Sequence, residues 1–355
     1  MGNVLFWATR EGVRAAGVPL GAGGALVSQT SRLSWIRTWA VQRLRWVADG
    51  LVYLIVRVVL CVLQALPIET CDQLARGLAW LAYDGLRVRR RITDENLGYA
   101  FPELSAERRA NIARGMWHHL VLMVCELAQL NRKIHESNWT DYVVCRDVAE
   151  HVRWLTSSRP VVMVSGHYGN FEVGGVLAGL LGFPTYTIAR PLDNPFLHRF
   201  ITRHRSAKGQ FMLPKNGSAQ DADRILSAGG TLVLLGDQYA GAKGCWVPFF
   251  NRPASCHKAI ALFALAHQAP LVLSYARRLD RPMRFEVGIA AVFDPKEHPQ
   301  ANVRQITAWY NQQLEALVRQ HPEQYWWVHR RWREQPPART PASDPAAGPV
   351  PHRAA

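Results

Sequence analysis

A histidine and a glutamate lie five residues apart in the segment SGHYGNFEV, which covers residues 165–173. A neutral imidazole can accept a proton from a hydroxyl group, and a carboxylate bonded to its other ring nitrogen fixes the tautomer and stabilises the imidazolium. Five residues correspond to about 140° of rotation on an ideal helix, so His167 and Glu172 cannot meet on one helix face. They can meet only if His167 lies in a turn and Glu172 in the first turn of a helix, an entry that Gly166 and Gly169 permit.

The sequence contains no GxSxG pattern, so it does not indicate a serine nucleophile on the protein. The remaining chemistry for such a pair is deprotonation of a substrate hydroxyl, which then attacks an activated acyl group. An HxxxxE spacing also arises by chance, and in that case His167 and Glu172 only form a turn between two buried elements. The spacing by itself leaves both interpretations open.

Polar residues follow three strand-like segments, and this pattern indicates a site at one edge of a sheet. The segments are VVMVS (161–165), TYTIA (185–189) and TLVLLG (231–236). Because ligands bind beyond the carboxyl ends of the strands in α/β sheets, we expect the residues after these segments to converge. Besides His167, these residues are Arg190, Asp193, Asn194, Asp237 and Gln238.

The elements that would hold such a site are predicted in the second half of the chain. Further β-rich runs cover 270–277 and 284–293, and segments of helical length separate most of the runs. This alternation predicts an α/β fold with a mixed, largely parallel central sheet flanked by helices. Residues 70–155 have a mostly helical pattern, and His118 and His119 within it are expected to have structural roles.

The chain of 355 residues carries 42 Lys plus Arg against 27 Asp plus Glu, a net charge of +15, and it contains 13 tryptophans. Such an excess of positive charge indicates an anionic partner, either nucleic acid or an anionic membrane surface. Arginine makes bidentate phosphate contacts and tryptophan settles at membrane–water interfaces, so the combination favours the membrane. The six cysteines form no CxxC pair and no zinc ligand set, so we expect no metal.

A membrane-anchor helix is predicted at 46–67. Residues 51–66 are apolar except for Arg57 and Gln64. These sixteen residues are fewer than the roughly 20 that span a bilayer, and an arginine in mid-membrane costs about 2.5–3.5 kcal/mol. We therefore favour a monotopic or shallowly inserted helix, and a buried core helix is the alternative. The other predicted parts are a basic, Trp-rich leader at 1–45, the main domain at 68–335 and a disordered Pro/Ala-rich tail at 336–355.

The segment SGHYGNFE resembles the HxxxxD/E motif of glycerolipid acyltransferases, and in its particular form it resembles the late acyltransferases of lipid A biosynthesis, the lauroyl and myristoyl transferases. Three further blocks resemble that family in the same order. They are ARPLDNPFLHRFITRHRSAKG, LSAGGTLVLLGDQYAGAKGCWVPFFNRPAS and HPEQYWWVHRRWREQPP, and with the first block they cover roughly residues 85–337. The resemblance implies a membrane-bound enzyme that transfers a fatty acyl chain, usually from acyl-carrier protein, to a hydroxyl of a glycolipid precursor.

The resemblance also implies roles for individual residues. His167 would be the general base and Glu172 its orienting partner, while Arg190 would bind phosphate or the thioester oxyanion. Arg330 and Arg331 would contact anionic headgroups or sugar phosphates, and the alternative for them is a C-terminal helix packed on the domain. The full set of expected substrate-binding residues is Asn170, Arg190, Asp193, Asn194, Asp237, Gln238, Arg330 and Arg331.

The resemblance also implies the substrates and the location of the enzyme. The donor would be acyl-carrier protein or an acyl-CoA thioester, with no other cofactor, and the site would lie at the cytoplasmic face of the bacterial inner membrane. Phe171, where tryptophan is common in the family, and CHKAIALFA at 256–264 depart from the pattern and leave the acceptor open. Alternative acceptors are a phosphatidylinositol mannoside, an ornithine lipid or a lysophospholipid; a non-catalytic membrane-binding protein on the same fold is a further alternative. Helices at 173–182 and 259–267 are expected to line an apolar groove for the acyl chain.

Overall fold

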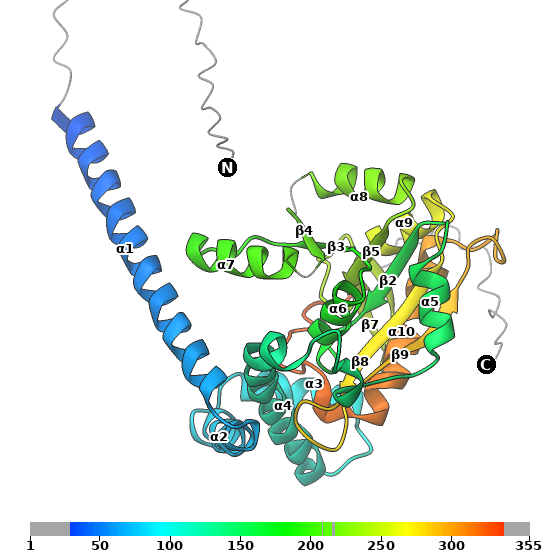
Figure 1. Ribbon diagram of the computed structural model, residues 1–355, viewed down its shortest axis with the longest axis horizontal. Helices are drawn as coiled ribbons and strands as arrows, with labels where there is room; N and C mark the ends of the chain where they lie inside the picture. Colours follow the sequence, from blue (N-terminus) through cyan, green and yellow to red (C-terminus); the bar gives the residue numbers. More distant parts are fainter. Residues whose placement is uncertain (1–28, 208, 215–216, 337–355) are drawn as a thin grey trace, which may run out of the picture. The chain divides into compact units, whose positions relative to one another are not determined.

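The computed structural model describes residues 29–207, 209–214 and 217–336 (Figure 1). Most of the predicted leader and nearly all of the predicted tail therefore lie outside the described residues. The chain divides into two units, one ending at Gly50 and the other beginning at Leu51. The second unit contains the sheet and the site described below.

Helix α1 (Gln29–Ala65) begins within the predicted leader and continues through the predicted anchor. Its section Val41–Ala65 is 25 residues long and apolar, and by length and composition it can cross a membrane. This section is longer than the apolar run at 51–66 because it also includes residues 41–50 of the same helix. The alternative of a buried core helix is wrong, since none of the residues in this section is buried.

The helical region predicted at 70–155 is present, and it leads into an α/β domain. The helices before the sheet are α2 (Ile68–Trp80), α3 (Arg90–Ala100) and α4 (Ala106–Lys133). The helices within the α/β part are α5 (Val148–Leu155), α6 (Phe171–Leu180), α7 (Pro195–Ser206), α8 (Ser218–Ser227), α9 (Ala259–Ala266) and α10 (Val303–Gln320).

Seven strands of the described residues form one sheet in the order β1-β9-β8-β2-β5-β3-β4. Every neighbouring pair is parallel except β8 and β9, so the predicted mixed, largely parallel sheet is confirmed. The strands are β1 (Val143–Cys145), β2 (Val161–Ser165), β3 (Thr185–Ala189), β4 (Gln210–Pro214), β5 (Thr231–Leu235), β8 (Leu271–Arg278) and β9 (Phe285–Phe293). A separate antiparallel pair, β6 (Cys245–Phe249) and β7 (Arg252–Cys256), lies between α8 and α9 in the sequence.

Strand β2 is buried along its whole length because β8 and β5 flank it and helices cover both faces. Val162 and Val164 share a core cluster with residues of α9 and α10, whereas Val161 and Met163 pack with Trp154 of α5. Successive side chains of a strand point to opposite faces, so the two groups occupy opposite sides of the sheet. This double coverage explains the uninterrupted apolar run that the sequence shows at this strand.

The register between β2 and β5 sets the geometry of the site. Ser165 at the end of β2 pairs with Leu235 at the end of β5, and Gly236 donates its backbone N–H to the carbonyl of Ser165 at 2.9 Å. The two chains therefore leave the sheet side by side at the same edge. One glycine follows each of these strands, and the residues after the glycines are His167 and Asp237. The pairing of β2 with β5 therefore brings His167 and Asp237 together.

Candidate active site

A histidine–aspartate pair lies at the carboxyl edge of the sheet. The Nδ1 atom of His167 is 2.8 Å from Oδ1 of Asp237, and the backbone N–H of His167 donates to Oδ2 at 2.7 Å. Because a carboxylate only accepts, Nδ1 carries a proton, and in the neutral form of the ring Nε2 has the lone pair. The side-chain nitrogen of Gln238 lies 3.4 Å from that Nε2 atom. His167 is therefore held in the tautomer that a general base requires.

The carboxylate of this pair stays ionised. Asp237 is almost completely buried, and burial by itself would raise the pKa of its carboxyl. When His167 is protonated, its charge, its two hydrogen bonds and the charge of Arg331 outweigh that effect and hold the pKa at about 2. Asp237 is therefore ionised at neutral pH and can stabilise an imidazolium there.

Aromatic rings enclose the imidazole. The ring centroid of Trp326 is 4.4 Å from that of His167, and the ring of Phe171 meets it edge-on at 5.2 Å. The backbone N–H of Trp326 also donates to the carbonyl of His167 at 3.1 Å, and Gly169 donates to the carbonyl of Gln324 at 2.9 Å. The C-terminal segment thus clamps the turn that carries the histidine. Sequence reasoning missed this role of Trp326, for which the paired tryptophans of QYWWVH were the available signal.

Glycine at position 169 is required by a close backbone approach, and we expect Gly169→Ala to be strongly destabilising. Its φ is +61°, and an added Cβ would lie 2.1 Å from the carbonyl oxygen of Ala276 in β8. The expected loss is at least about 2 kcal/mol of unfolding free energy, measured by chemical denaturation.

Gly182→Ala is the matched control for that substitution. Gly182 also has a positive φ, +85°, but its Cβ would meet nothing within 4 Å. Gly182→Ala should lower the unfolding free energy only by the cost of a left-handed conformation at alanine, about 1 kcal/mol. Equal losses of unfolding free energy at positions 169 and 182 would show that the close approach to Ala276 does not contribute to the effect.

The predicted contact between His167 and Glu172 is not the one that forms. Glu172 lies in the first turn of α6 and makes an ion pair with Arg205 of α7. Asp237 occupies the place next to Nδ1, because β5 is the immediate neighbour of β2 and ends level with it. Asp237, which was expected among the substrate-binding residues, is thus the partner of His167.

Asn170 supports the turn and cannot contact a substrate, because its side chain is fully buried. Its Nδ2 donates to Glu126 of α4 at 3.1 Å, and Glu126 accepts two further hydrogen bonds from Arg278 at 2.6 and 2.7 Å. Arg278 in turn donates to Nδ1 of His119 at 2.9 Å, and His119 donates from Nε2 to the carbonyl of Gly169 at 3.1 Å. This network connects α4, β8 and the turn after β2.

The two histidines of α4 have the structural roles predicted for them. Burial, aided by the charge of Arg278, lowers the pKa of His119 to about 3, so its ring is neutral inside the network. His118 lies 2.7 Å from the carboxylate of Asp72 in α2 and connects the two helices. Both rings therefore belong to the scaffold.

The residues after β3 form a cap and an exposed ion pair. The side chain of Asn194 accepts hydrogen bonds from the backbone of Phe196 and Leu197 at 3.0 and 3.1 Å, so it caps α7. Arg190 and Asp193 pair with each other at 2.8 Å, and both side chains are about three-quarters exposed. In the part of the chain that the structure describes, neither contacts His167 or Asp237, so their expected substrate contacts stay predictions.

The two arginines of the C-terminal block have different environments. Arg331 is buried and donates to the carbonyl of Ser255 at 2.6 Å, to Asn311 at 3.2 Å and to the carbonyl of Gln238 at 3.3 Å. It therefore ties the loop after β5 to β7 and α10 and cannot reach a headgroup. Arg330 is exposed. The segment is packed on the domain, but apart from a short 3-10 helix at Pro322–Gln324 it consists of turns, so the predicted packed helix is wrong in form.

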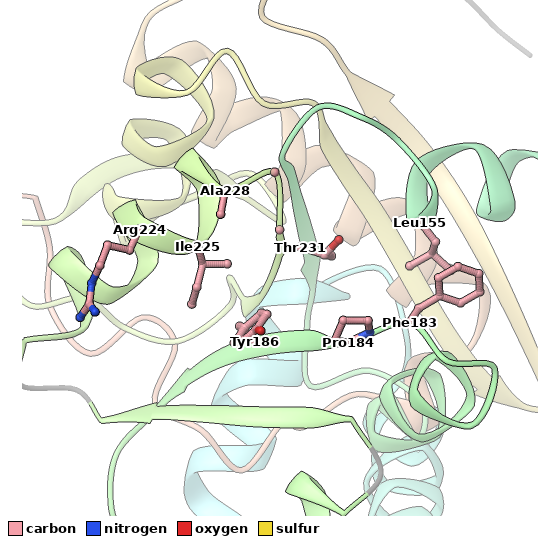
Figure 2. Close-up of a pocket in the computed structure, with 10 residues that line it drawn as sticks. Leu155, Phe183, Pro184, Tyr186, Arg224, Ile225, Ala228 and Thr231 are labelled. Atoms are coloured by element: carbon pink, nitrogen blue, oxygen red, sulfur yellow. The ribbon is translucent and has the colours of Figure 1, made fainter.

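Two cavities of the described residues bear on the question of a substrate site. One, of about 360 Å³, lies at the amino ends of β3 and β5, with Pro184, Tyr186 and Thr231 on its wall (Figure 2). It is at the edge of the sheet opposite to His167, so it does not serve the chemistry there. The other, of about 640 Å³, lies beside the loop after β5. The groove expected between the helices at 173–182 and 259–267 stays a prediction.

Fold and site together define a class of protein: an α/β protein with a histidine at a strand end whose ring is oriented by a buried carboxylate. Residues 41–334 match the model of the bacterial lipid A biosynthesis acyltransferase family. The chain belongs to that family and is an acyltransferase. Among the described residues, no group of three or more His, Cys, Asp or Glu side chains is arranged to hold a metal ion.

Individual relatives are similar over most of their length. The chain is 25% identical over 301 residues to the lipid A biosynthesis lauroyltransferase of Escherichia coli, an alignment that covers 82% of this chain and 92% of that protein. It is 26% identical over 299 residues to the palmitoleoyltransferase of the same organism, with the same coverage. A solved 1-acyl-sn-glycerophosphate acyltransferase from Thermotoga maritima aligns over 72% of this chain and 97% of that one, with 12% identity and a TM-score of 0.34.

Proposed function

We propose that this enzyme moves a fatty acyl chain from a thioester donor, acyl-carrier protein or acyl-CoA, onto a hydroxyl group of a lipid A-type glycolipid precursor. The observation that carries the proposal is the hydrogen bond between Nδ1 of His167 and the ionised Asp237, which makes Nε2 the ring atom that can take a proton. Family membership supports the acyl group as cargo and the glycolipid as acceptor. No cofactor is needed for the steps below.

The mechanism has two proton transfers. Nε2 of His167 takes the proton of the acceptor hydroxyl as its oxygen attacks the thioester carbonyl, and a tetrahedral intermediate forms. When this intermediate collapses, the carbon–sulfur bond breaks and the imidazolium returns the proton to the leaving thiolate. Asp237 stabilises the imidazolium between the two steps. The amide of Gln238, close to Nε2, is in position to donate to an oxygen bound there.

Membrane association is part of the proposal. The section Val41–Ala65 of α1 offers an unburied apolar surface, and the net charge of +15 suits anionic headgroups as well as an acidic carrier protein. We place the site at the cytoplasmic face of the bacterial inner membrane, where a lipid acceptor and a soluble thioester donor can both reach it. A non-catalytic protein on this fold is disfavoured, because the paired His167 and Asp237 are intact.

Mass spectrometry of membrane lipids tests this function. Wild type and His167→Ala are each produced in a bacterial host that lacks its own late lipid A acyltransferases. The expected result is a lipid A species heavier by one acyl chain with wild type and its absence with the variant. The same new species from both proteins would refute the role of His167, and a new acylated lipid of another class would refute the acceptor.

A further inference from the structure

A cavity of about 640 Å³ opens beside the catalytic pair and has a strongly basic wall. Its volume is within the range of about 300–1,000 Å³ that is typical of pockets for small molecules. We refer to it as the arginine pocket. Its lining residues are Arg89, Ile92, Tyr239, His329, Arg330 and Arg333.

The arginine pocket shares its wall with the active site. Tyr239 follows Asp237 by two residues, and its backbone N–H donates to Nε2 of His329 at 3.0 Å. The ring of His329 stacks on Trp326 with centroids 6.1 Å apart, and Trp326 covers His167 at 4.4 Å. A molecule that reaches from the pocket to Nε2 of His167 therefore passes along one continuous wall.

The charge of the pocket is positive and largely uncompensated. Arg330 and Arg333 are exposed, and neither pairs with a carboxylate within the described ranges. The carboxylate of Glu334 interacts with the side chain of Tyr239 in the pocket wall. Burial lowers the pKa of His329 to about 4, so this ring is neutral and contributes polarity without charge. Asp237, which acts electrostatically on His329, is a second carboxylate near the wall, so three guanidinium groups lie near two carboxylates and the net charge stays positive.

Two arginines of α3 that do not line the pocket have carboxylate partners, unlike the arginines of the pocket. Arg90 lies 3.6 Å from Asp94, and Arg91 lies 3.3 Å from Glu95, each on the next helical turn of α3. Arg89, at the start of that helix, instead donates to the carbonyl of Val328 at 3.0 Å. This bond fixes one side of the pocket to the C-terminal segment. Arg89 is therefore fixed by a carbonyl group, while Arg330 and Arg333 are exposed and have no carboxylate partner among the described residues.

We propose that the arginine pocket binds a phosphate group carried by one of the two substrates while the reacting group of that substrate lies at His167. The planar guanidinium matches phosphate with two parallel hydrogen bonds, and two or three such groups suit a dianion. This inference rests on the proposed function, because it assigns part of the substrate. A phosphate on the glycolipid acceptor and a phosphate on the carrier arm of the donor are its two sources.

Binding is measured first, without catalysis. Full-length protein with His167→Ala, in detergent, is titrated with glucose 1-phosphate, and line broadening in ³¹P NMR reports the complex. We expect saturable binding that weakens as salt is added, since the contacts are between charges. Glucose competes poorly because it lacks the phosphate. Absence of binding, or equal competition by glucose, would overturn the proposal whether or not the enzyme transfers acyl chains.

The variants Arg330→Ala and Arg333→Ala, combined in one protein, locate the site. Both side chains are exposed, so their removal leaves the fold intact. We expect glucose 1-phosphate to bind about tenfold or more weakly, and the corresponding double lysine variant to recover part of that loss. Arg153→Ala on α5, another exposed arginine, is the control and should bind as wild type does. Unchanged binding in the double alanine variant would show that the phosphate site is elsewhere.

Steady-state kinetics of the otherwise wild-type enzyme then identify the source of the phosphate. A KM for the glycolipid that is about tenfold higher in the double alanine variant, with kcat within about twofold, assigns the phosphate to the acceptor. The same rise in the KM for the thioester assigns it to the donor. A fall in kcat with neither KM changed would contradict a binding role for the pocket.

Discussion

Asp237→Asn should lower kcat/KM for acyl transfer by about three to four orders of magnitude while the protein stays folded. The carboxylate accepts one hydrogen bond from Nδ1 and another from the backbone of His167. An amide has only one oxygen, so its NH₂ group faces Nδ1 or the backbone N–H. In the first case Nδ1 becomes the acceptor, and the proton moves to Nε2, where it blocks the base.

Glu172→Gln is the matched comparison, because it makes the same chemical change in the carboxylate that the sequence motif predicted as partner. Glu172 pairs with Arg205 at a partly exposed position, so the expected loss of kcat/KM is within about tenfold. Circular dichroism confirms that each variant is folded. A loss at Glu172 as large as that at Asp237 would restore Glu172 as the functional partner of His167.

Glu126→Ala should remove about 3–5 kcal/mol of unfolding free energy, the largest stability effect that we expect from a single substitution. Glu126 is completely buried and accepts hydrogen bonds from Arg278, Asn170 and the backbone of Met283. Its removal leaves the guanidinium of Arg278 charged and buried without a counterion. The measurement is denaturant unfolding of the detergent-solubilised protein, followed by tryptophan fluorescence.

The double variant Glu126→Leu with Arg278→Met separates the two contributions to that loss. Replacing both charges by apolar groups of similar size removes the unpaired charge, so the double variant should be more stable than Glu126→Ala. A loss of less than about 1 kcal/mol in Glu126→Ala would mean that water reaches the pair and that its burial has little energetic weight.

The sequence predicts the strands better than the partners of the site residues. The five runs assigned as strands correspond to β2, β3, β5, β8 and β9, because buried strands show apolar runs and the turns between them show glycine and proline. The short strand β1, the edge strand β4 and the β6–β7 pair were missed. β1 has only three residues, and two of the five residues of β4 are exposed. In β6 buried and less buried positions alternate, but Trp246 and Pro248 at the less buried positions hide this alternation in the sequence.

The partner of His167 could not be identified from spacing, because it depends on strand order. Glu172 is five residues away in the chain, whereas Asp237 is seventy residues away and becomes adjacent only when β5 pairs with β2. Burial is equally hidden: Asn170 and Arg331 carry polar groups typical of ligand binding, yet the structure uses both internally. The prediction that polar residues after three strands converge was correct for the first and third of them.

The most direct test of the catalytic role of His167 uses purified protein, a thioester donor and a lipid A precursor, with free thiol and acylated lipid measured in the same reaction. The account predicts one thiol released for each ester formed by wild type, and a rate lower by about three orders of magnitude or more for His167→Ala. Acyl transfer by His167→Ala at the rate of wild type would contradict it.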